Sequence, residues 1–222
     1  MSVLVDEHGD KQYKVMIAVP SGDDVKADFA FDLARLMGYT TFVRPRMTVL
    51  LYAVKGTYLP RARAALVKAA LEHACSHILW LDADMRFPKD TLIRLIGHDM
   101  PIVAANYPTR QAPILPTALD TNLQPVFERE GMIDVRCCGM GVMLTDVDVF
   151  TAIGLPYFAV GYNRGIDDYA GEDTYFCERA RACGYRVVVD GPLSEEVSHV
   201  GGFAYHLDHA RLTLDAAVAA GA

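Results

Sequence analysis

The chain has 222 residues, of which 52% are hydrophobic and 22% charged, a composition that excludes a disordered or fibrous protein. Its length suits one well-packed α/β domain. Lys and Arg total 21 against 28 Asp and Glu, and the net charge of −7 argues against indiscriminate binding to nucleic acid or anionic lipid.

Five cysteines without a Cys-x-x-Cys pair indicate neither a zinc knuckle nor a disulfide framework, and they suit a reducing compartment. No apolar stretch approaches the ~20 residues that are needed to span a bilayer. We therefore expect a soluble, cytoplasmic protein, in the host cytoplasm if the chain is viral, without a secretion signal or a transmembrane segment.

Strand and helix patterns alternate through the first half of the chain. Gly38 and Gly97 are expected to end the first and third helices. The alternation predicts a single α/β domain with a mainly parallel sheet and helices on both faces. Apolar, β-rich runs predict strands at 14–19, 48–52, 78–80 and 102–105, and helical patterns occupy 24–37, 60–74 and 89–96.

The second half begins with a different pattern. Prolines and turn residues from 106 to 134 predict a long loop with a hairpin, a kind of segment that shapes binding sites. A stretch at 158–171, rich in Gly, Tyr and Asp, is expected to be mobile. Further strands are expected at 140–144 and 186–189, and helices at 147–153, 172–183 and 207–220.

Asp82 and Asp84 directly follow the strand predicted at 78–80. Side chains two residues apart leave an extended chain on the same side, so both carboxylates can face one cleft. In open parallel sheets ligands bind beyond the carboxyl ends of the strands, where Pro20 and Ser21 also fall. The pattern predicts a site for Mg²⁺ or Mn²⁺ bound to a diphosphate, and the alternative is a polar turn that caps the next helix.

Two further groups are candidates for chemistry. Glu172 and Asp173 open a predicted helix, where acidic residues either cap the helix or, if its start faces the cleft, accept a proton from an attacking hydroxyl. His199 is either an ordinary surface or core histidine or a third metal ligand beside the two aspartates.

In this order, the three groups resemble the GT-A nucleotide-sugar glycosyltransferases of the family 2-like group, most closely its small phage and bacterial members. The resemblance covers most of the chain, and the combination of motifs is far more specific than any single one. The matching segments are 15–20, 59–63, 78–88, 105–110, 138–141 and 171–177, together with His199.

The resemblance implies a division of labour among the matching residues. Asp84 and His199 would bind Mn²⁺ or Mg²⁺. Asp82 would bind either the ribose or, through a water molecule, the metal. Asp173 would be the catalytic base, with Glu172 beside it. The expected contacts with the nucleotide base, the phosphates and the sugar come from Pro20 and Ser21, from Arg63, and from the backbone at Gly139 and Gly141.

Two of these expectations have structural alternatives. Arg63 could instead be a solvated arginine on an amphipathic helix. The aromatic side chains near the mobile stretch fit stacking on a sugar or base as well as they fit anchoring of the loop. These aromatic residues are Tyr157, Phe158, Tyr162 and Tyr169.

The resulting prediction is a metal-dependent glycosyltransferase that moves a sugar from a nucleoside-diphosphate sugar to a hydroxyl acceptor. Within one domain at 1–222, residues 14–105 would form the nucleotide-binding half, 106–205 the acceptor and metal half, and 206–222 a C-terminal helix. The acceptor would be a glycan, a small molecule or, in a virus, a modified DNA base. The alternatives are a nucleotidyltransferase that makes nucleotide sugars and a catalytically silent nucleotide- or glycan-binding module.

Overall fold

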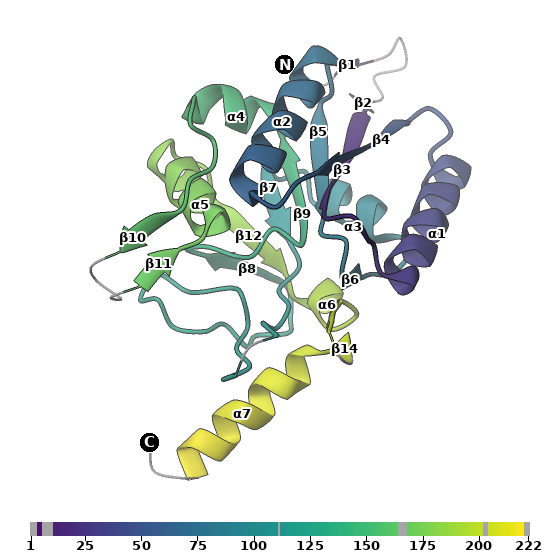
Figure 1. Cartoon of the computed structure of the whole chain (residues 1–222). Helices are drawn as coiled ribbons and strands as arrows, with labels where there is room; N and C mark the ends of the chain where they lie inside the picture. Colours follow the sequence, from purple (N-terminus) through teal and green to yellow (C-terminus); the bar gives the residue numbers. More distant parts are fainter. Residues whose placement is uncertain (1–3, 6–10, 111, 164–167, 202–203, 220–222) are drawn as a thin grey trace.

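The computed structural model describes residues 4–5, 11–110, 112–163, 168–201 and 204–219. A seven-stranded sheet in the order β4-β3-β5-β9-β7-β12-β8 forms its centre (Figure 1). β9 pairs antiparallel with β5 and β7, and β8 pairs antiparallel with β12, whereas the other neighbours are parallel. The strands are β3 (Lys14–Ser21), β4 (Thr48–Lys55), β5 (His77–Leu81), β7 (Ile102–Ala104), β8 (Met132–Val135), β9 (Val142–Asp146) and β12 (Val187–Asp190).

Helices cover both faces of this sheet, because its central strands are apolar on both sides. On β3, Val15 and Ile17 belong to one buried cluster and Met16 to the other. The cluster around Val15 and Ile17 is closed by α1 (Ala27–Val43) and α3 (Thr91–Gly97), and the cluster around Met16 by α2 (Leu59–Glu72), α4 (Val147–Ile153) and α5 (Glu172–Ala182). The predicted fold class, a mainly parallel sheet between helices, is confirmed.

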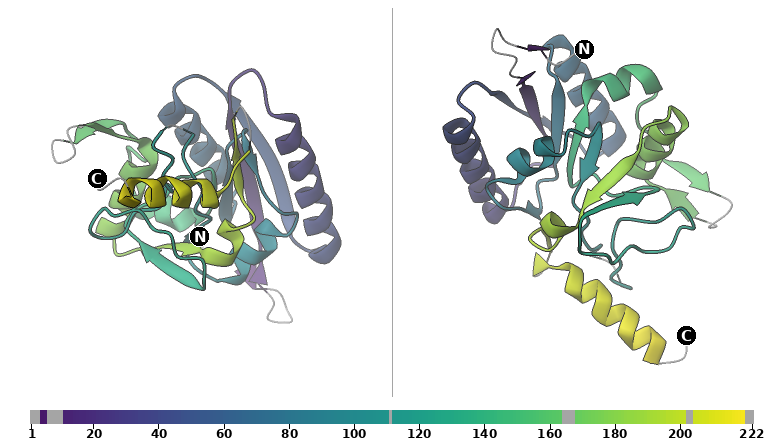
Figure 2. Two further views of the ribbon diagram at one scale, coloured as in Figure 1. Left: turned by 90° about the horizontal axis from the view of Figure 1, so that it is seen from below. Right: turned by 180° about the vertical axis from the view of Figure 1, so that it is seen from behind.

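Smaller elements surround this core. α7 (Leu207–Ala219) follows the short helix α6 (Gly191–Ser194) and extends away from the sheet (Figure 2). A second sheet, in the order β14-β13-β6, joins β6 (Met85–Arg86), β13 (Ser198–Val200) and β14 (Ala204–Tyr205). Two hairpins pair β1 (Leu4–Val5) with β2 (Lys11–Gln12) and β10 (Gly161–Asn163) with β11 (Asp168–Ala170).

Gly38 does not end the first helix, because α1 continues to Val43. A mid-helix glycine costs about 0.5–1 kcal/mol relative to alanine, which the burial of Phe29 and Leu36 outweighs. Gly97, in contrast, is the last residue of α3, as expected. The segment expected to be mobile contains the β10–β11 hairpin, and its residues 164–167 lie outside the described part of the chain.

In the expected long loop, the described residues between β7 and β8 form only isolated bridges, such as Leu119 with Pro125. Across the described residues, no helix combines the length and the apolar character needed to cross a bilayer.

Candidate active site

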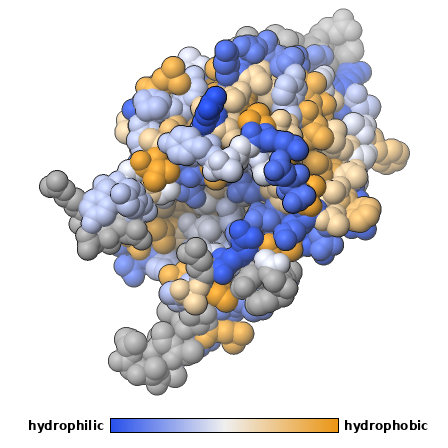
Figure 3. Space-filling model, in the orientation of Figure 1, coloured by the Kyte–Doolittle hydropathy of each residue, from blue (hydrophilic) through white to orange (hydrophobic). Residues whose placement is uncertain are grey.

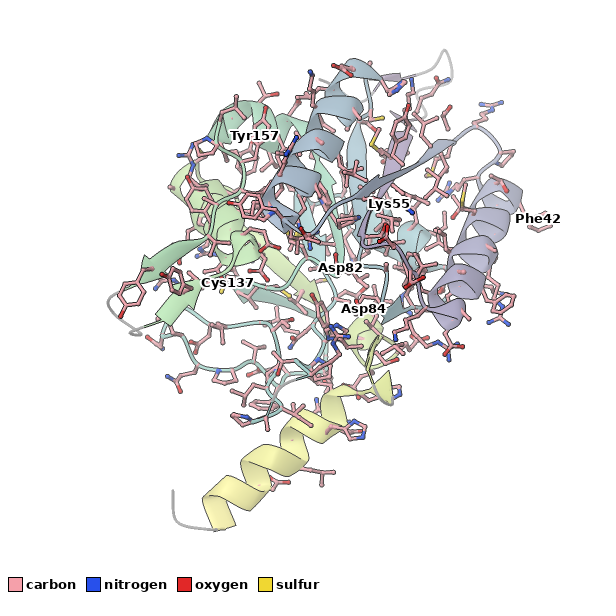
Figure 4. The ribbon with its side chains drawn as sticks, in the orientation of Figure 1. Phe42, Lys55, Asp82, Asp84, Cys137 and Tyr157 are labelled. Atoms are coloured by element: carbon pink, nitrogen blue, oxygen red, sulfur yellow. The ribbon has the colours of Figure 1, made fainter. Side chains whose placement is uncertain are left out.

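Asp82 and Asp84 lie just beyond the carboxyl end of the buried strand β5 (Figure 4). The Asp82 N–H donates to the Gly141 carbonyl oxygen at 3.0 Å, and the Met85 N–H donates back to the Asp82 oxygen at 3.0 Å. The chain therefore turns at these residues instead of continuing as an extended strand. As a result the two carboxylates border the same cavity but contact different partners.

The second sheet brings His199 to Asp84. β13 pairs with β6 so that His199 lies opposite Met85, and the Val200 N–H donates to the Asp84 carbonyl oxygen at 2.7 Å. His199 Nε2 lies 3.4 Å from Asp84 Oδ2, and Nδ1 lies 3.1 Å from the Pro108 carbonyl oxygen. The structure thus brings together two predicted metal ligands, Asp84 and His199, that lie far apart in the sequence.

The contact with Pro108 fixes the orientation of the imidazole. A carbonyl oxygen can only accept a hydrogen bond, so Nδ1 of His199 carries the hydrogen. In the neutral ring Nε2 then presents its lone pair to the carboxylate of Asp84, an arrangement that suits a cation between the two groups. Without a cation, Nε2 can donate to Asp84 only when the ring is doubly protonated.

Arg63 connects Asp82 with the start of α5. Its side chain is 2% exposed, and Nη2 donates to both carboxylate oxygens of Asp82 at 2.9 and 3.2 Å. Nε donates to Glu172 Oε1 at 3.3 Å, and the guanidinium lies over the Trp80 ring at 5.7 Å. The structural alternative for Arg63, a solvated arginine on an amphipathic helix, is therefore wrong.

Three carboxylates, those of Asp82, Glu172 and Asp173, act on the charge of the Arg63 guanidinium. Burial, reinforced by the charges of Asp84 and Glu172, raises the pKa of Asp82, although Arg63 opposes the shift. Burial and the charge of Glu172 likewise raise the pKa of Asp173, whose Oδ1 accepts a hydrogen bond from the Thr174 N–H at 2.7 Å. Asp173 is thus a carboxylate at a helix start with a pKa displaced upward, as a general base requires.

Asp84 has the opposite shift. Burial acts to raise its pKa, but the hydrogen bond and charge of His199, followed by the charge of Arg110, lower the pKa below the ordinary value. Asp84 therefore stays ionised in the presence of these two partners. An ionised carboxylate is a suitable ligand for a hard divalent cation.

The cavity beside Asp84 has a volume of about 580 Å³, within the range of small-molecule sites. Hydrophilic side chains gather at the centre of this face (Figure 3). A second cavity of about 640 Å³ lies around Tyr13, Arg44 and Met47, where no candidate catalytic residue is found among its lining residues. We assign the site to the first cavity, whose lining includes Pro20, Ser21, Gly22, Asp24, Lys26, Gly56, Thr57, Asp82, Asp84, Arg110 and His199.

The predicted residues do not all face this cavity. Pro20, Ser21, Asp82, Asp84 and His199 line it, whereas Arg63, Glu172 and Asp173 are not among its lining residues. Across the described residues, no three His, Cys, Asp or Glu side chains cluster as a ligand group, because Asp82 turns to Arg63. The binding of Asp82 to a ribose, or to a metal through a water molecule, stays a prediction.

Gly139 and Gly141 are buried next to Tyr107. A Cβ on Gly141 would lie 2.7 Å from Tyr107 Oη, and one on Gly139 would lie 2.8 Å from Cζ of the same ring. The Gly141 N–H also donates to Tyr107 Oη at 2.8 Å. The two glycines therefore make room for Tyr107, whose ring meets that of His199 edge-on at 5.5 Å. Their predicted contact with a sugar stays a prediction.

The four aromatic residues divide into two pairs. Phe158 is 6% exposed and packs with Phe176 in the core, and Tyr157 meets Phe150 edge-on at 5.6 Å. Tyr162 and Tyr169 are 51% and 67% exposed, and they face each other across the β10–β11 hairpin. The first pair anchors the chain, and the second is on the surface, close in sequence to Asp173.

Arg110 is a charged residue of this cavity to which the sequence assigned no specific role in the donor site. Its Nη2 lies 3.0 Å from Asp84 Oδ2, and its Nη1 donates to the Val200 carbonyl oxygen at 3.1 Å. The available signal was its place in the matching segment 105–110. That segment carries no periodic pattern, so the direction of the side chain was not predictable.

No protein-family model and no curated protein matches the sequence. Among solved structures, A197 from STIV is 15% identical, covers 85% of this chain and 86% of that chain, and superposes with a TM-score of 0.58. This likeness shows a shared fold.

Two further structures match less well. A 4-diphosphocytidyl-2C-methyl-D-erythritol synthase is 14% identical over 81% of this chain and 88% of that chain, with a TM-score of 0.41. A glycosyltransferase involved in the glycosylation of the major capsid of PBCV-1 is 12% identical over 64% of this chain and 69% of that chain, with a TM-score of 0.33. These scores are too low to establish a shared fold.

Proposed function

We propose that the chain is a metal-dependent glycosyltransferase that moves a sugar from a nucleoside-diphosphate sugar to a hydroxyl acceptor. The observation that carries the proposal is the pair Asp84 and His199, oriented through Pro108 beside a cavity at the carboxyl ends of parallel strands. In open α/β sheets this edge is where nucleotides bind. The sequence resemblance to GT-A glycosyltransferases supports the same assignment.

The donor would occupy the cavity. Pro20 and Ser21 form the wall where the nucleotide base is expected, and Lys26 and Arg110 are cations in the lining near which a diphosphate can be held. Asp84 and His199 would hold Mn²⁺ or Mg²⁺, which when bound neutralises charge on the leaving diphosphate. A site with two protein ligands suits these ions, because they take further ligands from substrate phosphates and water.

The acceptor would approach from the side of α5. Glu172 is engaged by Arg63 at 3.3 Å, so Asp173 is the freer carboxylate and the better base. It would accept the proton of the attacking hydroxyl, and its raised pKa, caused mainly by burial, suits that role. Arg63 would hold the α5 start and Asp82 in fixed positions. The exposed pair Tyr162 and Tyr169 would contact the acceptor.

A panel of nucleotide sugars, incubated with Mn²⁺ or with EDTA, tests this function. Metal-dependent release of nucleoside diphosphate supports the transferase. Release of pyrophosphate from a nucleoside triphosphate and a sugar phosphate would identify a nucleotidyltransferase. Metal-dependent nucleotide binding without turnover would identify a binding module.

Asp84→Asn and Asp134→Asn provide a matched pair for this assay. Both aspartates pair with arginines, but Asp134 pairs with Arg181 and Arg186 away from the cavity. We expect Asp84→Asn to abolish the release and Asp134→Asn to leave it unchanged. Absence of nucleoside diphosphate release across the whole panel, with folded protein and candidate acceptors present, would refute the proposal.

A further inference from the structure

Arg110 forms an ion pair with Asp84, the carboxylate that would bind the proposed cation. Its Nη2 lies 3.0 Å from Asp84 Oδ2, the same oxygen that faces His199 Nε2 at 3.4 Å. A guanidinium and a divalent cation on one carboxylate oxygen would repel each other at short range. The arginine therefore has to leave Asp84 when a cation binds there.

The surroundings of Arg110 allow this movement. Its side chain is 41% exposed, and the residue lies in the irregular chain after β7, outside any helix or strand. Among the described residues, it forms the ion pair with Asp84 and donates one hydrogen bond to the Val200 carbonyl oxygen. Asp84, in contrast, is held by the β6–β13 pairing, because its carbonyl oxygen accepts the Val200 N–H.

The same cavity offers Arg110 a second partner once a donor binds. A guanidinium presents a planar set of N–H donors that matches two phosphate oxygens. We propose that Arg110 is a displaceable counter-ion. It neutralises Asp84 in the empty site, and it transfers to the diphosphate when a cation and a nucleotide bind. This inference rests on the proposed function, and it adds to that function the exchange of Arg110 from Asp84 to the diphosphate when the metal binds.

The proposal predicts that substitution of Arg110 raises the affinity for Mn²⁺ and lowers the affinity for the diphosphate. Arg110→Ala removes a competitor from Asp84, so Mn²⁺ alone should bind more tightly, by a factor on the order of 5 or more. The same substitution removes a charge-assisted hydrogen bond, so the diphosphate should bind about tenfold or more weakly at saturating Mn²⁺. A residue that only supports the structure would weaken both constants together.

Isothermal titration of the full chain measures both constants without turnover. Mn²⁺ is titrated alone, and UDP and GDP are then titrated at saturating Mn²⁺. Arg186→Ala is the matched control, because Arg186 also pairs with one aspartate but does not line the cavity. Arg110→Gln serves as a second variant if Arg110→Ala does not unfold cooperatively in urea.

Tighter Mn²⁺ binding with weaker diphosphate binding, in an Arg110 variant but not in Arg186→Ala, is the expected result. Both constants weakened, or both unchanged, would overturn the inference while leaving the proposed function intact. A wild-type chain that binds neither Mn²⁺ nor diphosphate would overturn both.

Discussion

The imidazole of His199 lies with Nε2 3.4 Å from Oδ2 of Asp84, with its other nitrogen bonded to the Pro108 carbonyl oxygen. Three segments that are distant in sequence thus meet at one point, the end of β5, the loop after β7 and the strand β13. The pairing of β6 with β13 places His199 opposite Met85, next to Asp84. A preorganised arrangement of this kind would reduce the conformational cost of binding the proposed donor.

Arg63→Ala should lower the free energy of unfolding by about 3–5 kcal/mol, because it leaves the carboxylates of Asp82 and Glu172 half-buried without their cation. Urea denaturation measures this change. Arg35→Ala is the control, since Arg35 is 66% exposed and its pairing with Asp32 is worth about 0–1 kcal/mol. Equal losses in the two variants would show that the Arg63 pairs contribute little.

Asp173→Asn should reduce turnover by about 10²–10⁴-fold while stabilising the fold at neutral pH. Burial raises the pKa of Asp173 in the folded chain above its ordinary value of 3.8. The folded state therefore binds this proton more tightly than the unfolded state does, and wild-type stability decreases as the pH rises between the two pKa values. The asparagine keeps the acceptor for Thr174 and carries no charge.

Two measurements check this prediction. Urea unfolding should show the variant more stable than wild type above the titration range, with the difference vanishing below the ordinary pKa. The wild-type turnover should rise with pH through a value above the usual aspartate range. A variant with normal turnover would remove Asp173 from the chemistry.

Gly141→Ala should destabilise the chain by about 1–3 kcal/mol, because the new Cβ would lie 2.7 Å from Tyr107 Oη and 3.1 Å from Met85 Cγ. Gly38→Ala should instead stabilise it by about 0.5–1 kcal/mol, since Gly38 lies within α1 and has nothing within 4 Å of a Cβ. Thermal or urea unfolding compares the two. Equal effects would show that Tyr107 yields to the added methyl group.

Tyr169→Ala should raise the acceptor KM by about tenfold at nearly constant kcat, if its ring, 67% exposed, contacts the acceptor. Its stability should change by no more than about 0.5 kcal/mol, as for ordinary surface substitutions. Steady-state kinetics at saturating donor provide the test. A large loss of stability with an unchanged KM would favour the alternative that the tyrosine only anchors the hairpin.

The elements of the fold were predictable where apolar periodicity is strong. Helix 147–153 was predicted with the bounds that α4 has, and the strand predicted before Asp82 is present as β5, which is buried throughout. The antiparallel direction of β9 was not predicted, because an apolar run is the same in either direction. β6 and β13, two and three residues long, are too short to produce a periodic pattern.

The site was predictable in its residue types but not in its pairings. The motifs indicated that Asp82, Asp84 and His199 form one metal site, whereas in the structure Asp82 forms an ion pair with Arg63. A turn at 82–85, formed by the hydrogen bond from Met85 N–H to Asp82 O, separates the two carboxylates. Local spacing cannot reveal a buried arginine from a preceding helix, because that contact depends on how α2 packs on the sheet.

The central claim is that a divalent cation between Asp84 and His199 holds the diphosphate of a nucleotide. Calorimetric titration of UDP and GDP into wild type, Asp84→Asn, His199→Ala and the double variant, each with Mn²⁺ or EDTA, tests it most directly. We predict Mn²⁺-dependent binding by the wild type, loss of that binding in each single variant, and no further loss in the double variant. Binding that is equal with Mn²⁺ and EDTA, or that survives in both single variants, would contradict the claim.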